Sequence, residues 1–440
     1  MININISSKF LSEKKYIIDI IFNEFLGLTY KINIRNCENY EIILNNNKII
    51  IIKDYFFKKH EKEEQYLSIE NIPKECKFIK KSALIDNNIP IIFGKNQLNI
   101  NPNRIISEID IFSSSFFMLT RWEEYVNKKR DLHNRFPLRE SYAYKNKFYE
   151  IPVVNEYVEI LWKMLVYLGC KQERKKRSFN KILTHDIDLL LFSSRSILKT
   201  VSAELFFRKN VSNAFYSLRN IIKGRMNKDL DLFNNFNYLM NLSEKYNLKS
   251  YFFFMGINKK KNNGGYPLKS KFIKSIIGEI IKRGHIIGFH PGYETYNNYK
   301  KWKQEYELLS ECFSQKITCG RQHFLRFDIP LTFQIWEDNK MEWESSLGFS
   351  EKEGFRCGTC YEFSTFNIKT RQKLKLKEKP LIVMDDTIDN KGKIEKVINI
   401  KNTIKRFNGD FVLLWHNSSF NIPIWENGKQ IYEEILKNLS

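Results

Sequence analysis

The chain has 440 residues, of which 42% are hydrophobic and 15% aromatic, so it can bury a large core and is not a disordered chain. This length favours two domains, or one enlarged barrel with an accessory domain, over a single ordinary domain. The formal net charge of +22 comes mostly from scattered lysines, and the basic clusters at Lys171–Arg177 and Lys259–Lys261 are short and lack interleaved aromatic residues. We interpret the charge as a compositional bias and expect neither a nucleic-acid partner nor binding to an anionic membrane, while an acidic substrate such as a charged glycan stays open.

The N-terminal segment and the cysteines bear on the compartment. The first 22 residues alternate polar and apolar side chains, unlike a signal peptide, and no apolar run approaches the ~20 residues of a membrane span. Seven scattered cysteines predict reduced thiols, and the closest pair, Cys357 and Cys360, lacks the second pair of a zinc ribbon, so we give it a structural role. We therefore expect a cytoplasmic protein without a membrane span.

Short alternating segments predict β-strands in the first 130 residues, at 28–34, 40–44, 48–52 and 91–93. A helical pattern follows over 109–125, where Phe116, Leu119 and Trp122 recur at helical spacing, and we expect Trp122 in the core. This part is typical of a small α+β domain.

An extended connection with breakers at Pro137 and Pro152 leads to a predicted helix at 155–168. The basic cluster Lys171–Arg177 then has the composition of a linker. We therefore divide the chain into an N-terminal α+β accessory domain with its linker, residues 1–175, and a second domain, residues 176–440.

From residue 181 onward, predicted strands alternate with predicted helices at 233–246, 271–282 and 299–312. The strand candidates include 250–255, 319–327, 342–349, 381–384 and 411–415. Repeated strand–helix units over about 260 residues favour a parallel barrel or a doubly wound sheet.

The stretch KILTHDIDLLL, residues 181–191, opens this second domain. Ile182 and Leu183 are typical of a buried strand, and Asp186 and Asp188 follow where that strand would reach the surface. Strand ends of this kind point into the ligand crevice of a parallel sheet or barrel. Alternatively, the two carboxylates cap a turn by accepting backbone N–H bonds.

Four of the seven histidines also lie at the ends of predicted strands: His185, His290, His323 and His416. Strand ends of one barrel converge on a single mouth, so these side chains can be neighbours in space. Carboxylate and imidazole ligands that leave one position open form a hydrolytic metal site, in which a second carboxylate serves as base and a further histidine as acid. The sequence supplies every one of these groups.

The motifs THDID, GFHPG, RQH and LLWH resemble those of the polysaccharide deacetylase family, carbohydrate esterase family 4, over residues 178–420. The resemblance implies a distorted (β/α) barrel that removes acetyl groups from N-acetylated sugars with a divalent cation. It assigns the general base to Asp186, metal ligands to Asp188 and His290, an arginine that orients the base to Arg321, and the general acid to His416.

The chain departs from this family at one ligand. Where the family has a second histidine four positions after the first, this chain has Glu294. Either Glu294 binds through oxygen, which zinc accepts, or His323 supplies the third ligand, and we favour His323. His185 takes a position that is usually apolar or aromatic in the family, so we expect it to pack behind the site.

The motifs GRQHFLRF, SSLGF and GFRCGTC are similar to those of a subgroup with an uncharacterised N-terminal domain, as are the IDIFSSSFFMLTRWEEY and HNRFP stretches. The similarity to this subgroup leaves two roles open for Arg321, Arg326 and Arg356. They either bind an anionic or hydroxyl-rich substrate or form ion pairs within the protein.

Together these features predict a metal-dependent carbohydrate deacetylase, with zinc as the expected cation. It would remove an N-acetyl or related acyl group from a precursor of a surface polysaccharide. Two alternatives stay open: a non-catalytic glycan-binding barrel, and a hydrolase of another C–N amide bond.

Overall fold

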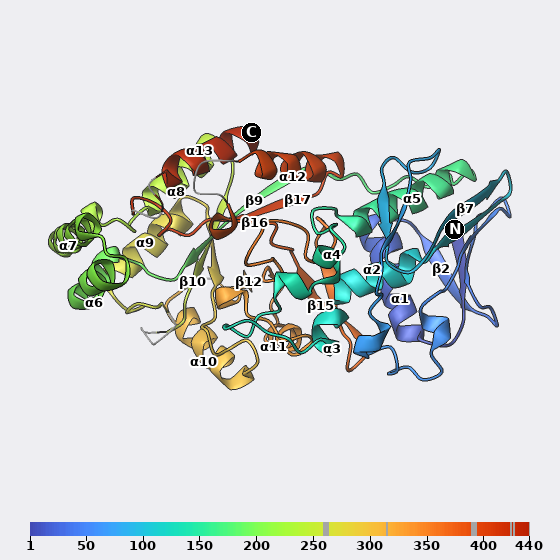
Figure 1. The fold of residues 1–440 in the computed structure, drawn as a ribbon, viewed down its shortest axis with the longest axis horizontal. Helices are drawn as coiled ribbons and strands as arrows, with labels where there is room; N and C mark the ends of the chain where they lie inside the picture. The colour runs from blue at the N-terminus through green and yellow to red at the C-terminus, as the bar shows by residue number, and fades with distance from the viewer. Residues whose placement is uncertain (258–263, 314–315, 389–393, 423–424, 426, 440) are drawn as a thin grey trace.

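The computed structural model describes residues 1–257, 264–313, 316–388, 394–422, 425 and 427–439, so the basic cluster Lys259–Lys261 lies outside the described residues. Two sheets organise the chain, and Figure 1 shows the N-terminal one at one end of an elongated molecule and the larger one at its centre.

The N-terminal sheet has six strands in the order β2-β1-β3-β4-β8-β7. Parallel pairs (β1 with β2, β4 with β8) are mixed with antiparallel ones. Alternating side chains fix its two faces, since Ile2, Ile4 and Ile6 of β1 are buried between half-buried asparagines. The strands are β1 Ile2–Ile6, β2 Tyr30–Ile34, β3 Tyr40–Ile43, β4 Ile49–Ile52, β7 Gly94–Asn101 and β8 Arg104–Ile109, with a separate pair β5 Lys77–Ile79 and β6 Ile89–Ile91.

Helices pack beside this sheet and link it to the second one. The predicted helix over 109–125 is two helices, because Arg121 takes a left-handed conformation (φ 53°) between them. Trp122 is fully buried there, as expected. The helices are α1 Leu11–Asp19, α2 Ile111–Thr120, α3 Trp122–Val126, α4 Tyr142–Lys145 and α5 Val153–Tyr167.

The second sheet has nine strands in the order β14-β15-β13-β12-β11-β10-β9-β17-β16, all parallel except β14. Without β14, this is the cyclic order of an eight-stranded (β/α) barrel opened between β15 and β16. Only residues 379–382 separate those two strands, too few for the crossover that neighbouring parallel strands require. The strands are β9 Asn180–Ile187, β10 Ser250–Phe254, β11 Ile286–Phe289, β12 Cys319–Gly320, β13 Trp343–Glu344, β14 Phe363–Asn367, β15 Gln372–Glu378, β16 Val383–Met384 and β17 Asp410–Leu414.

The helices of this part are α6 Ile197–Ser202, α7 Val211–Met226, α8 Phe236–Lys245, α9 Lys271–Lys282, α10 Tyr299–Ser310, α11 Leu331–Asp338, α12 Glu395–Arg406 and α13 Gly428–Leu439. The expectation of an α/β chain with a distorted barrel and a smaller N-terminal α+β part is confirmed by this arrangement. Among the described residues, no helix has both the length and the apolar character needed to cross a bilayer.

The two sheets share one hydrophobic core. A single cluster of buried side chains runs from Ile2 to Leu439 and includes residues of both parts. Polar contacts reinforce the junction: the Tyr16 hydroxyl donates to the Ser364 carbonyl at 2.9 Å, and Arg371 forms a bidentate pair with Glu13. The N-terminal part is therefore fixed against the barrel.

Candidate metal centre and its pocket

The candidate site lies at the carboxyl ends of the parallel strands. Asp186 is near the end of β9 and Asp188 follows it, His290 follows β11, and His416 follows β17. Strand β12 is short, and a Cβ on Gly320 would lie 1.9 Å from the Phe289 carbonyl oxygen, so only glycine allows the close approach of β12 to β11. The chain then turns at once, which brings His323 back over the strand ends.

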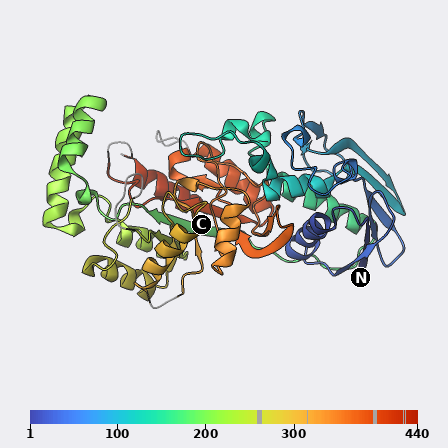
Figure 2. The same cartoon turned by 90° about the horizontal axis from the view of Figure 1, so that it is seen from below.

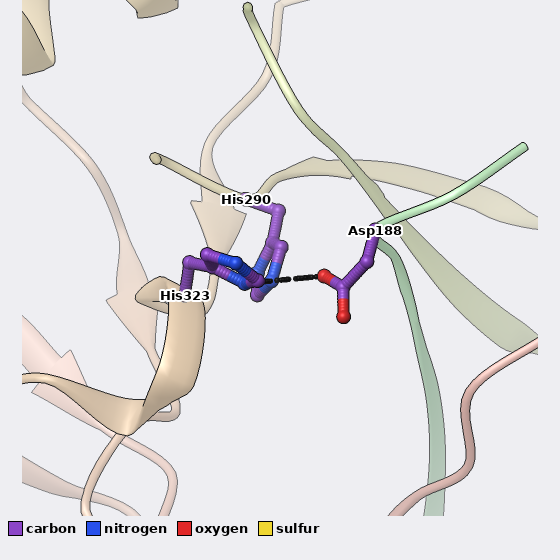
Figure 3. A group of neighbouring side chains, drawn as sticks. All are labelled: Asp188, His290 and His323. Atoms are coloured by element: carbon purple, nitrogen blue, oxygen red, sulfur yellow. Dashed lines mark hydrogen bonds and ion pairs between the residues drawn. The ribbon is translucent and has the colours of Figure 1, made fainter. Parts of the chain in front are cut away.

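Three ligand atoms from three strand ends meet at one point, as Figure 3 shows. Asp188 Oδ1 lies 3.1 Å from His290 Nε2 and 3.2 Å from His323 Nδ1, and the two ring nitrogens are 3.0 Å apart. Ligand atoms of a tetrahedral zinc centre lie about 3.3 Å apart, given bonds of about 2.0 Å. The spacing of this triangle therefore fits a small divalent cation.

The protonation of the triangle also suits a cation. His290 Nδ1 lies 2.7 Å from the Arg321 carbonyl oxygen, which can only accept, so Nδ1 carries a hydrogen and Nε2 is the nitrogen that faces Asp188. Burial opposes ionisation of Asp188, but His323 and His290 outweigh it and hold the pKa of the carboxyl well below its usual value. The site thus offers one anionic oxygen and two imidazole nitrogens.

Asp186 lies beside the triangle and is held by a buried guanidinium. Arg321 Nη1 donates to Asp186 Oδ1 at 2.9 Å and to Thr184 Oγ1 at 2.8 Å. The other edge of the guanidinium donates to the carbonyl and the hydroxyl of Ser345. Because Arg321 is fully buried and bound on both edges, it fixes Asp186 Oδ1 and leaves Oδ2 toward His290, 3.7 Å from Nδ1.

His416 approaches from the opposite side and is held by Asp385. Its Nδ1 lies 2.9 and 3.0 Å from the two carboxylate oxygens, and its backbone N–H donates to Asp385 Oδ2 at 2.8 Å. Burial lowers the pKa of His416, but the Asp385 carboxylate reverses this and raises it well above the usual value. A protonated His416 therefore presents Nε2, which lies 3.8 Å from Asp188 Oδ2.

A pocket of about 140 Å³ joins these groups. Phe324 and Leu325 form part of its wall, and both have left-handed backbones (φ 61° and 53°), a conformation that such side chains rarely adopt. The strained turn places His323 at the triangle with Phe324 beside it. The full lining is Arg135, Asp186, Asp188, His290, His323, Phe324, Leu325, Ser350, Met384, Asp386, Leu414 and His416.

Arg135 comes from the N-terminal part of the chain. Its loop folds around Asp131, which accepts from the backbone N–H of Arg135 and from Nε at 2.7 Å. The loop rests on the barrel through His133, whose ring lies 4.7 Å from that of Phe324. The N-terminal part therefore contributes a guanidinium to the pocket wall.

The structure sorts the remaining predicted residues. Glu294 is solvent-exposed and pairs with Lys301, and the group of ligand atoms contains His323 in its place. His185 packs behind the site, where Nδ1 bonds to the Trp415 carbonyl and Nε2 to the Ser250 hydroxyl. Burial lowers the pKa of His185 to about 4, so the ring is neutral.

The two other arginines are engaged within the protein. Arg326 stacks on Tyr293 and donates to the His133 carbonyl, and Arg356 pairs with Glu124 in the core. Neither lines the pocket. Arg356 forms an ion pair within the protein, as its alternative expected, whereas Arg326 is held by aromatic stacking and backbone carbonyls.

Neither Asp385, which holds His416, nor Arg135, which lines the pocket, was found from the sequence. Asp385 follows a strand that was predicted, so its place at a strand end was an available signal. Arg135 lay in the HNRFP stretch, but its approach to the barrel depends on how the two parts pack, and no local pattern encodes that.

Comparisons with known proteins concern both parts of the chain. Residues 2–169 match the model of a family described as a family of unknown function (DUF7033). No curated protein matches the chain. A crystal structure of a "putative polysaccharide deacetylase" from Mycobacterium smegmatis is similar at 14% sequence identity and a TM-score of 0.39, over 60% of this chain and 85% of that one. The chain is thus similar to DUF7033 in its N-terminal part and, over 60% of its length, to a structure described as a deacetylase.

Proposed function

We propose that the protein is a metal-dependent hydrolase that removes an N-acetyl or related acyl group from a carbohydrate. One observation carries the proposal: in a single pocket, the Asp188–His290–His323 triangle lies between a carboxylate held by Arg321 and an imidazole held by Asp385. The motifs that resemble those of carbohydrate deacetylases fall on these same residues.

Asp188, His290 and His323 would hold the cation, and we expect zinc. When bound, a divalent cation polarises the acyl oxygen and lowers the pKa of a water molecule. Asp186 takes the proton of the attacking water at Oδ2, because Oδ1 is engaged by Arg321. The water oxygen bonds to the amide carbon, the C–N bond breaks, and His416 gives the proton on Nε2 to the departing amine.

We also propose that residues 1–175 act as an accessory domain to a catalytic domain of residues 176–440. The described structure holds all seven cysteines as free thiols, which supports a cytoplasmic protein. A carbohydrate suits a pocket lined by carboxylates and a guanidinium, since both bond to hydroxyl groups.

The test combines metal content with activity on the full chain. After chelation and reloading with Zn²⁺, elemental analysis should find one ion per chain, and release of acetate from N-acetylated sugars should depend on it. Asp186→Asn should keep the ion and lose roughly 10²–10⁴-fold in kcat, because it removes the base without removing a ligand. His290→Ala should lose both the ion and the activity.

Glu294→Gln is the matched control, because the sequence offers Glu294 and His323 as alternatives for the third metal ligand. It should keep the ion and the activity. Full activity of a folded Asp186→Asn variant would refute the base assignment. Release of formate or ring opening of cyclic amides, without acetate release from any sugar, would assign the site to another C–N bond.

A further inference from the structure

A helical hairpin, residues 197–226, projects from the barrel between β9 and β10. It consists of α6, a π-helical continuation over residues 203–207, and α7. Figures 1 and 2 show it at the end of the molecule opposite the N-terminal sheet. We call this segment the basic hairpin.

One face of α7 is apolar and uncovered. Val211, Phe215, Ile222 and Met226 follow one another at i, i+4, i+11 and i+15, which places them on one side of the helix. Their exposed fractions are 73%, 68%, 46% and 83%. The residues that α7 buries are on another face and mostly small: Ala214, Ser217, Ile221 and Gly224. The large apolar side chains therefore point away from the protein.

The end of the π-helical continuation carries two more exposed aromatic side chains. Phe206 is 75% exposed and Phe207 is 88% exposed, and Arg208 and Lys209 follow directly. Single exposed apolar residues are ordinary, but this many large exposed apolar side chains within one short hairpin favour an interaction site.

The same segment is strongly cationic. Residues 197–226 contain six Lys or Arg and one Glu, a net charge of +5, and all six basic residues are exposed. Lys223 and Arg219 lie on one side of the apolar row, and Arg225 lies on the other side, where its guanidinium donates to the Ser193 and Arg195 carbonyls. Basic side chains beside an apolar row can extend their charged ends to lipid phosphates while their stems cover the apolar surface.

The hairpin is held firmly at its base. Asp231 accepts from the backbone N–H groups of Phe192 and Ser193 at 2.7 and 2.8 Å, and Phe192, Ile221 and Phe233 form a small core of their own. Its exposed face is therefore presented by a fixed platform and is not the surface of a loose tail.

We propose that the basic hairpin binds the surface of an anionic lipid bilayer. A second copy of the chain fits less well, because a two-fold interface would set one +5 surface against another. Nucleic acid would match the charge but offers no apolar volume for Val211, Ile222 and Met226. A bilayer with acidic headgroups supplies both the negative charge and the apolar interior.

Flotation of the full chain with lipid vesicles tests the proposal. The protein should float with phosphatidylcholine vesicles that contain about 30% phosphatidylglycerol and not with phosphatidylcholine alone. Raising NaCl from about 0.1 to about 0.5 M should weaken the binding. Phe206→Ser with Phe207→Ser should reduce the affinity roughly tenfold or more. Phe215→Ser with Met226→Ser is a second pair at other positions, in case the first affects folding.

Leu132→Ser with Lys80→Ser and Lys81→Ser is the matched control, because it removes an exposed leucine and two exposed lysines far along the chain from the hairpin. It should bind vesicles like the unaltered protein. Equal binding by the control and both hairpin variants would overturn the proposal. So would binding to single-stranded RNA without binding to vesicles, or a dimer that the hairpin variants dissociate without any vesicle binding.

Discussion

Arg135 lines the pocket, yet it belongs to the N-terminal part of the chain. Its guanidinium is anchored to Asp131 through Nε and donates to the Phe324 carbonyl through Nη1, which leaves Nη2 for a substrate oxygen. Loss of a hydrogen bond from a charged donor costs about 1.5–3 kcal/mol. We therefore expect Arg135→Ala to raise KM at least about tenfold with little change in kcat or metal content. Steady-state kinetics should show no such effect for Arg139→Ala, an exposed arginine of the same segment.

Asp385 is a residue whose action passes through His416. Asp385→Asn would keep the shape of the side chain but weaken its hold on the imidazole and its support of the positive charge. We expect kcat to fall roughly 10²-fold or more, with the bound ion retained. Kinetics together with elemental analysis checks this, and an unchanged kcat would show that His416 does not depend on Asp385.

The residues of the candidate site were predictable to different extents. Asp188, His290 and His323 each follow a strand that the sequence indicates, so parallel strand order alone brings them together. The choice of His323 over Glu294 was open in the sequence because it depends on the left-handed turn at Phe324 and Leu325. Arg135 depends on how the two parts pack, which no periodic pattern reveals, whereas Asp385 directly follows a strand that the sequence indicates.

Two neighbouring strand ends carry a pair of buried carboxyl groups, Glu344 of β13 and Glu378 of β15. They are paired in the sheet and both are fully buried. Burial and then the negative charge of Glu344 raise the pKa of Glu378 well above its usual value, so Glu378 holds a proton when the protein is folded. Its hydrogen-bonding partners are Glu344 and the Leu347 N–H.

This pair predicts a pH-dependent stability. Between the unfolded pKa near 4.5 and the raised folded value, the folded state binds more protons, so the free energy of unfolding falls as pH rises. Glu378→Gln is neutral at every pH, so its free energy of unfolding should not fall with pH through this group. Relative to the unaltered protein, the variant should gain up to about 1.4 kcal/mol for each pH unit. Urea unfolding at pH 6, 7 and 8 measures the gap between variant and unaltered protein. Glu342→Gln, at an exposed neighbouring position, is the control. If the free energy of unfolding of Glu378→Gln fell with pH as steeply as that of the unaltered protein, Glu378 would not hold a proton in the folded state.

Helices and strands were predicted correctly where their buried residues recur at the spacing of a helix or a strand. The helix expected at 271–282 is α9, since its apolar residues recur at helical spacing. Strand β7 was missed, because only Leu98 and Ile100 alternate with exposed polar residues and its first half carries no apolar side chain. Strands β12 and β13 have two residues each, so their expected lengths were too long.

At the scale of the whole molecule, the spatial distribution of the positive charge was the feature that the sequence predicted least well. The scattered lysines predicted neither a nucleic-acid nor an anionic-membrane partner, yet the fold gathers six basic residues and an uncovered apolar row on the basic hairpin. The sequence of α7 has apolar residues at helical spacing, which predicts a covered face. Only the packing shows that the large apolar side chains are outside.

The junction between the two parts depends on a buried charge network around Glu124. Arg121 and Arg356 both donate to this carboxylate, and Arg356 comes from the barrel part. Burial opposes ionisation, but Arg356 and Arg121 hold the pKa of Glu124 down at about 2. Glu124→Gln would leave two buried guanidinium groups without full compensation, so we expect it to cost about 3–5 kcal/mol of the free energy of unfolding at pH 7.

The pH dependence of the stability lost in Glu124→Gln distinguishes an effect of the carboxylate charge from an effect of side-chain packing. Because the folded pKa of Glu124 lies below the unfolded value of 4.5, its stabilisation is complete above that value and is lost as pH falls toward about 2. Urea unfolding should therefore show a smaller gap between variant and unaltered protein at pH 3 than at pH 7. Asp86→Asn, which breaks an exposed pair with Lys163, should cost at most about 1 kcal/mol. A gap for Glu124→Gln as small as this control, or one that does not change with pH, would show that the charge network around Glu124 does not hold the two parts together.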